Sequence, residues 1–151
     1  MMGNKTSKRL FDFLTENKKS KVFLGGTCNE SSWREDLISM LDMNYFNPVV
    51  GDWNKEAQQE EKYQKEICTH HLYIITPKMT GVYSIAEVVD DSNKRPEGTI
   101  FCILSKDEGN IFTEGQVRSL SAVADMILRN GGEVFYTLND VADYLNQEQS
   151  H

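Results

Sequence analysis

The chain has little cysteine: only Cys28, Cys68 and Cys102 occur among its 151 residues. An odd number of cysteines without the spacing of metal ligands indicates neither a set of paired disulfides nor a zinc site. We therefore expect no metal centre and no disulfide scaffold. A reducing compartment suits this cysteine usage best.

Long hydrophobic runs and excess positive charge are also missing. No window approaches the roughly 18 consecutive apolar residues of a membrane-spanning helix, and residues 1–9 have no long apolar core behind them. We therefore expect a cytoplasmic protein with no membrane partner. The net charge is −7 at pH 7. Contacts with nucleic-acid phosphates require a basic face, so we expect no nucleic-acid partner.

The remaining composition is that of a globular domain, with 39% hydrophobic and 26% charged residues. A chain of this length most often forms one domain. We expect a helical extension over residues 1–19, where Leu10, Phe11, Phe13 and Leu14 have amphipathic spacing. A single domain over 20–147 and a short tail over 148–151 should follow.

Apolar strand patterns alternate with helical patterns along the domain. Short β-branched and aromatic runs occupy residues 21–24, 45–50, 72–76, 99–104 and 134–136, and residues 105–110 form a polar loop. Strands that alternate with helices predict an α/β fold. We expect a three-layer sandwich around a central, mainly parallel five-stranded sheet, flavodoxin-like or Rossmann-like.

The most informative stretch joins the strand 72–76 to a helix that carries Glu87. Pro77 and Gly81 interrupt regular structure, and Ser84 with Glu87 opens the helix. In open α/β sheets, ligands bind at the carboxyl ends of the strands, so Glu87 is a candidate functional carboxylate. The same two residues also fit a capping box, in which Glu87 would only bond back to the Ser84 amide.

Residues after the first two strands could complete such a site. Gly25, Gly26 and Thr27 follow the first strand, and two glycines there either let the backbone approach a ligand or form an ordinary turn. Trp33 could stack on a base or simply pack, and Ser32 with Glu35 fits a capping box of the next helix.

The loop at residues 51–54 carries Asp52 and Trp53 and lies on the same side if the strands are parallel. His70 and His71 are adjacent, so their side chains point apart if the next strand has begun. A shared metal ion is therefore not expected at these histidines.

Five groups of residues follow one another in a characteristic order. They are Lys21–Thr27, Trp33 with Arg34, Phe46–Pro48, Tyr63–Ile67 with His70–Ile75, and Ser84–Glu87. In this order they resemble the nucleoside 2-deoxyribosyltransferase-like family over residues 20–105. The resemblance implies a flavodoxin-like fold, a homo-oligomer, no cofactor, and a nucleoside or nucleotide as small-molecule substrate.

The resemblance also implies roles for individual residues. Glu87 matches the family's glutamate nucleophile, which attacks the anomeric carbon and breaks the N-glycosidic bond. The family's aspartate about six residues earlier is Gly81 here. The general acid is left to Glu66, Asp52 or another subunit. The substrate-binding set comprises Gly25, Gly26, Thr27, Trp33, Asp52, Trp53, Tyr63, Tyr83 and Ser84.

Two other functions remain open at this point. Toll/interleukin receptor (TIR) domains share the flavodoxin-like layout, and their NAD-cleaving members place a glutamate shortly after a serine, much as Ser84 precedes Glu87. That alternative replaces the deoxynucleoside by NAD. The third alternative is a non-catalytic nucleotide-binding or assembly module in which Glu87 is only a helix cap.

Overall fold

The computed structural model describes residues 19–149 and contains one five-stranded sheet whose strands are all parallel. The strands run in the spatial order β2-β1-β3-β4-β7. Their bounds are β1 Lys21–Gly26, β2 Asn44–Phe46, β3 His70–Ile75, β4 Thr99–Ile103 and β7 Glu133–Phe135. This is the flavodoxin-like strand order, which confirms the predicted fold class.

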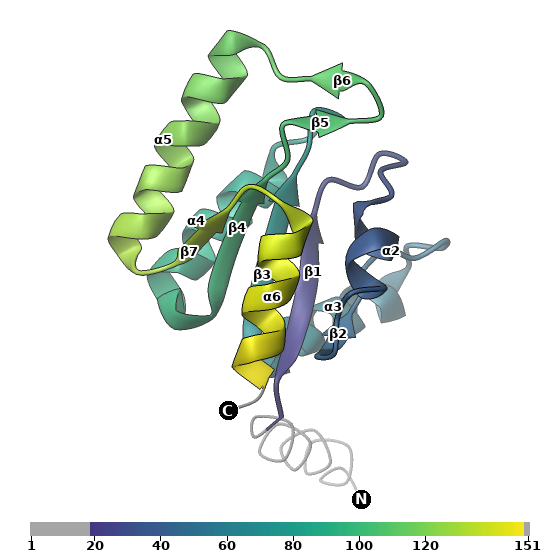
Figure 1. Cartoon of the computed structure of the whole chain (residues 1–151). Helices are drawn as coiled ribbons and strands as arrows, with labels where there is room; N and C mark the ends of the chain where they lie inside the picture. Colours follow the sequence, from purple (N-terminus) through teal and green to yellow (C-terminus); the bar gives the residue numbers. More distant parts are fainter. Residues whose placement is uncertain (1–18, 150–151) are drawn as a thin grey trace, which may run out of the picture.

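Helices cover both faces of the sheet, which gives three layers (Figure 1). One face packs against α2 (Trp33–Ile38) and α6 (Leu138–Gln149). The other face packs against α4 (Tyr83–Lys94) and α5 (Glu114–Asn130), with α3 (Lys55–Ile67) beside β1. A short 3-10 helix, Pro96–Gly98, leads into β4, and a hairpin of β5 (Lys106–Asp107) and β6 (Asn110–Ile111) follows it.

The core explains why the central strands are apolar throughout. Every residue of β3 and β4 is buried, because both faces of these strands are covered by helices. Leu72 and Ile74 pack on the side of α2 and α6, whereas Tyr73 and Ile75 pack on the side of α4 and α5. Alternate side chains of one strand therefore join the outer layers into one fold.

Helix ends follow the sequence signals in some places and depart from them in others. Thr113 and Gln116 form a capping box at α5, and Gly131 ends that helix in a left-handed conformation. The capping box predicted for Ser32 with Glu35 is wrong. Ser32 does precede α2, but its side chain makes no capping hydrogen bond.

Some predicted element bounds also differ from the structure. The strand expected over 45–50 is the short edge strand β2, because Pro48 has no amide to donate and the chain leaves the sheet before it. The loop expected over 105–110 contains the β5–β6 hairpin. The helix expected within residues 1–19 lies outside the described residues.

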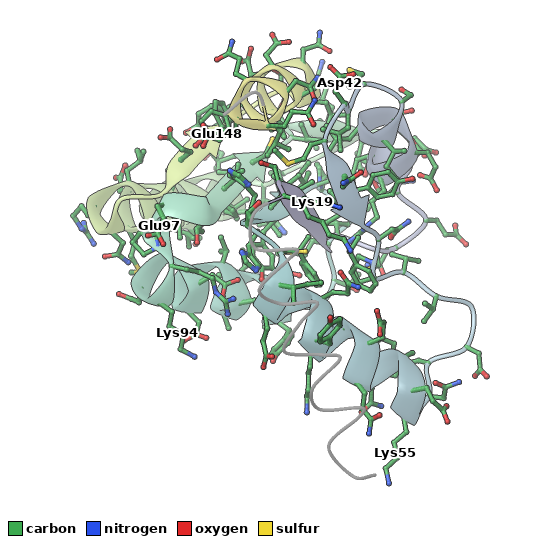
Figure 2. The ribbon with its side chains drawn as sticks, turned by 90° about the horizontal axis from the view of Figure 1, so that it is seen from below. Lys19, Asp42, Lys55, Lys94, Glu97 and Glu148 are labelled. Carbon is green, nitrogen blue, oxygen red and sulfur yellow. The ribbon has the colours of Figure 1, made fainter. Side chains whose placement is uncertain are left out.

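Charged side chains surround the amino-terminal edge of the sheet, seen from below in Figure 2. Lys94 of α4 and Glu148 of α6 lie on opposite sides of the sheet there. Glu148 links α6 to β3 through His70, the first residue of β3, with 3.3 Å between Glu148 Oε1 and His70 Nε2. Within residues 19–149, none of the helices combines the length and apolar composition needed to span a membrane.

The end of β1 approaches β3 so closely that it requires glycine. A Cβ atom at Gly26 would stand 2.1 Å from the Ile74 carbonyl oxygen, and Gly26 has a φ of 120°. At Gly25 a Cβ would meet the Tyr73 ring at 2.7 Å. The neighbouring strand β3 therefore takes up the space left by these two glycines, a reason for glycine that neither the ligand nor the turn alternative included.

We expect Gly26→Ala to lower the free energy of unfolding by about 3 kcal/mol or more, because overpacking and backbone strain add at one position. Urea denaturation measures this change. Gly51→Ala is the matched control, since a Cβ there meets nothing within 4 Å, and its effect should stay within about 0.5 kcal/mol. Equal stability of the two variants would contradict the steric explanation.

Candidate active site

A cavity of about 380 Å³ opens at the carboxyl edge of the sheet. The end of β1, the loop between β2 and α3, the middle of α3 and the first turns of α4 enclose it. Its lining residues are Phe23, Gly25, Gly26, Cys28, Arg34, Pro48, Val49, Val50, Trp53, Glu61, Tyr83, Ser84 and Glu87. The position agrees with the edge at which parallel sheets bind ligands.

A second cavity of about 280 Å³ adjoins the first. The loops after β1 and β3 enclose it, and Thr27, Asn29, Met79 and Thr80 are among its lining residues. Gly26, Cys28, Tyr83 and Ser84 line both cavities. Together they form one groove with a larger lobe that contains Glu87 and a smaller lobe without it.

Glu87 lies in the larger lobe, and its side chain is 14% exposed. Its Oε2 accepts a hydrogen bond of 2.7 Å from Nζ of Lys65 on α3. The Lys65 ammonium also lies over the rings of Phe23 and Tyr73, at 5.5 and 5.7 Å from their centroids. A partly buried cation therefore fixes the orientation of the Glu87 carboxylate.

The capping-box alternative for Ser84 and Glu87 is wrong. Helix α4 begins at Tyr83 after Val82, so Ser84 is not the residue that precedes the helix, and no side chain forms a capping hydrogen bond there. The Glu87 carboxylate bonds to Lys65 on another helix instead. Glu87 therefore lines the groove and does not cap the start of α4.

Glu61 is a second carboxylate in the larger lobe, and our sequence reasoning missed it. Burial raises the pKa of Glu61, the negative charge of Glu87 raises it further, and the Lys65 ammonium opposes both effects. The available signal was helical spacing, because Glu61 precedes Lys65 by four residues and shares its side of α3. The lobe therefore holds two carboxylates in different environments.

The structure brings together only part of the predicted site. Gly25, Gly26, Trp53, Tyr83, Ser84 and Glu87 line the larger lobe, and Thr27 lines the smaller one. The lining residues do not include Glu66, Asp52, Tyr63 or Trp33. Glu66 and Asp52 are exposed to solvent, and Tyr63 is half-buried on α3.

Trp33 and Arg34 hold the loop after β1 from beneath. Trp33 is 2% exposed, and its indole donates to the Thr27 carbonyl at 2.8 Å. The Arg34 guanidinium lies 4.3 Å from the centre of the Trp33 ring and donates to the carbonyls of Leu24, Gly26 and Thr27. Burial lowers the pKa of Arg34. Both side chains thus position the glycine turn, and Arg34 also reaches the groove.

A larger cavity exists elsewhere but has different chemistry. It measures about 1050 Å³, lies between α4 and α5, and has mainly apolar lining residues such as Ile85, Val89 and Val123. Asp90 is the one ionisable residue in its lining. Volume alone does not supply catalytic groups, so the smaller groove with two carboxylates is the candidate site. Across the described part of the chain, no three His, Cys, Asp or Glu side chains could hold a metal ion.

Beneath Glu87, a buried polar network joins β3, α3 and α4. The Tyr73 hydroxyl donates to Asp91, whose other oxygen is 3.0 Å from Nε of Arg95. Burial and the negative charge of Asp91 raise the pKa of Tyr73. The Lys65 carbonyl oxygen accepts from both Arg95 and His71, at 2.9 and 2.6 Å. The network anchors the residue whose ammonium holds Glu87.

Fold and groove define the class: a flavodoxin-like α/β domain with a groove at the carboxyl edge of its sheet, the edge at which such folds bind small molecules. The family described as "Nucleoside 2-deoxyribosyltransferase like" matches residues 19–94, which is half of the chain. The chain belongs to this family. Neither a curated protein nor a solved structure gave a significant match.

The buried network predicts how stability depends on pH. Burial is the main cause that lowers the pKa of His71 to about 4, so the folded protein favours the neutral imidazole. A histidine whose pKa is lower when folded contributes stability above its unfolded pKa and loses it as the pH falls. Between pH 6.5 and 4 we expect a loss of roughly 3 kcal/mol of unfolding free energy from this group.

Urea denaturation at pH 7 and pH 4.5 measures this loss. His71→Gln keeps a donor toward the Lys65 carbonyl but has no group that titrates in this range. The variant should therefore lose distinctly less stability than the natural protein between the two pH values. An equal loss in both proteins would assign the acid sensitivity to other groups.

Proposed function

We propose that the protein is an enzyme that cleaves or transfers at the N-glycosidic bond of a nucleoside or nucleotide, with Glu87 as its nucleophile. The main support is the Glu87 carboxylate, which lies in the larger lobe, is held by Lys65 at 2.7 Å, and shares that lobe with Glu61. Family membership favours a (deoxy)ribosyl substrate. The site requires no metal or cofactor for this chemistry.

The walls of the larger lobe suit an aromatic base attached to a sugar. Pro48, Val49, Val50 and Trp53 form an apolar side on the loop between β2 and α3, and Trp53 is 53% exposed. Apolar and aromatic walls with a few polar groups are typical of small-molecule sites, and about 380 Å³ falls within their usual range. We infer that the base lies against this side and the sugar lies toward Glu87.

In the first step, a Glu87 carboxylate oxygen forms a bond to the anomeric carbon. The bond between that carbon and the base nitrogen breaks, and the base leaves with its electron pair. Glu61 donates its proton to the departing base. Burial raises the pKa of Glu61, which favours the protonated form that this role needs.

In the second step, water or another base attacks the anomeric carbon of the glycosyl-glutamate ester. The ester bond breaks, Glu87 leaves as a carboxylate, and Glu61 accepts the proton of the attacking molecule. A covalent intermediate of this kind divides one difficult step into two easier ones. Glu61 thus takes the role that the resemblance left to Glu66, Asp52 or another subunit, because it lines the same lobe as Glu87.

Replacing the nucleophile should stop the reaction without unfolding the protein. Glu87→Gln keeps the size of the side chain but removes its nucleophilic charge, and we expect kcat to fall roughly 10⁴-fold or more. Base release from 2′-deoxyadenosine, thymidine and their 5′-monophosphates, followed by chromatography, measures this effect. Glu66→Gln is the matched control on an exposed carboxylate of α3, and its rate should stay near that of the natural protein. Turnover by Glu87→Gln at the natural rate would disprove the assignment.

The pH dependence of kcat tests whether Glu61 is the proton donor. Because the pKa of Glu61 is raised, the natural enzyme should lose activity as the pH increases and Glu61 deprotonates. Glu61→Gln should lower kcat by about 10² to 10⁴-fold, and its kcat should no longer fall as the pH increases. The measurement is kcat against pH for both proteins. An unchanged profile in Glu61→Gln would show that another group delivers the proton.

The same assay separates the other two functions. Nicotinamide release from NAD, without base release from any deoxynucleoside, would favour a TIR-like NAD glycohydrolase. No product from any of these compounds, together with measurable binding, would favour a nucleotide-binding module. The homo-oligomer implied by the family resemblance stays a prediction, and sedimentation of the full chain measures it.

A further inference from the structure

The β5–β6 hairpin stands at the carboxyl edge of the sheet, above the ends of β3 and β4 (Figure 1). Asp107 of β5 pairs with Asn110 of β6 in an antiparallel register. The hairpin comes after residues 19–94, so it lies beyond the part of the chain that matches the family. It is nevertheless connected to the candidate site through one side chain.

The Asp107 carboxylate bridges the two loops that enclose the smaller lobe. Its Oδ2 accepts hydrogen bonds from Ser31 Oγ and Thr76 Oγ1, both at 2.6 Å. Ser31 belongs to the loop after β1 and Thr76 to the loop after β3. The Asp107 side chain is only 9% exposed. Hydrogen bonds that a carboxylate accepts are among the stronger ones in proteins.

The bridged loops also contact each other. The Asn29 side chain donates to the Lys78 carbonyl and to the Thr80 hydroxyl, both at 2.8 Å. Between Asn29 and Ser31, Glu30 has a φ of 55°, a left-handed conformation that is uncommon for residues other than glycine. Such a conformation persists when surrounding contacts fix it from both sides. The loop after β1 is therefore held in one shape by its contacts.

We infer that Asp107 is a positioning residue that holds the loops after β1 and β3 in the geometry that binds the substrate. Asn29, Met79 and Thr80 line the smaller lobe. Asn29 lies two residues from Ser31, Met79 lies three residues from Thr76, and the Thr80 hydroxyl accepts a hydrogen bond from Asn29. Asp107 itself does not line the groove. Its effect on catalysis rests on the proposed function, whereas its effect on the loops does not.

Hydrogen exchange of the full chain tests the effect on the loops directly. In Asp107→Ala, the amides of residues 27–32 and 78–82 should exchange at least about tenfold faster than in the natural protein. The Lys78 and Met79 amides, which donate to the Thr76 hydroxyl and carbonyl, are the most informative. Amides of β3 and β4 should keep their protection.

Three further variants make this result specific. Asp107→Asn retains one acceptor oxygen, so its loop amides should exchange faster than those of the natural protein and more slowly than those of Asp107→Ala. If Asp107→Ala does not fold, Asp107→Asn takes its place in the test. Ser31→Ala with Thr76→Val removes both donors and should reproduce the effect at residues 27–32 and at Met79, with no further increase when Asp107→Ala is added. The Lys78 amide is left out of this comparison because Thr76→Val also removes its acceptor. Glu108→Gln alters only the exposed partner of Lys78 and should match the natural protein.

Two exchange results would overturn the inference. Loop amides in Asp107→Ala that exchange at the natural rate would show that the bridge does not hold the loops. Faster exchange spread equally over β3, β4 and the loops would show that Asp107 only contributes to global stability. In either case Asp107 has no positioning role.

Kinetics then tests the consequence for substrate binding. With the compound that the natural enzyme turns over fastest among 2′-deoxyadenosine, thymidine and their 5′-monophosphates, KM should rise about tenfold in Asp107→Ala while kcat changes little. A fall in kcat at unchanged KM would contradict positioning of the binding loops. If the natural protein turns over none of these compounds, the proposed function fails, and the exchange result still decides whether Asp107 holds the loops.

Discussion

Lys65 is the residue on which the geometry of the groove depends. Its ammonium holds Glu87 at 2.7 Å, and its carbonyl oxygen accepts from His71 and Arg95. One residue of α3 is therefore fixed to α4 through its side chain and to β3 and the end of α4 through its backbone. Since each contact is partly buried, water competes less for it than at the surface, and the carboxylate keeps one orientation.

The groove combines features that a solvent-exposed surface could not maintain. Glu61 and Glu87 share one lobe, yet burial and mutual repulsion act on Glu61 while Lys65 is bonded to Glu87. Two carboxyl groups in unlike environments can hold different protonation states, which is the arrangement that acid–base and nucleophilic steps require. Pro48, Val49, Val50 and Trp53 form an apolar side of the same lobe, and this is the side on which we propose that the base lies.

Sequence reasoning predicted the fold and one of the two carboxylates that line the candidate groove, but not the other. Alternation of strands and helices was enough to predict the sheet, and Glu87 was found from its place after the central strand. Glu61 was missed because its helical spacing from Lys65 does not by itself show which of the many acids on a polar surface helix faces a cavity. Trp33 was listed among the substrate-binding residues, although its indole N–H donates a hydrogen bond to the Thr27 carbonyl within the protein.

By itself, the sequence determined the order of elements and the apolar character of β3 and β4. These features follow from local backbone preference and from burial on both faces of a strand. Only the tertiary structure decided that Lys65 meets Glu87, that Glu61 faces the same lobe, and that Asp107 bridges two loops. Such pairs depend on how helices and loops pack in three dimensions, and residue spacing along the chain does not specify that packing.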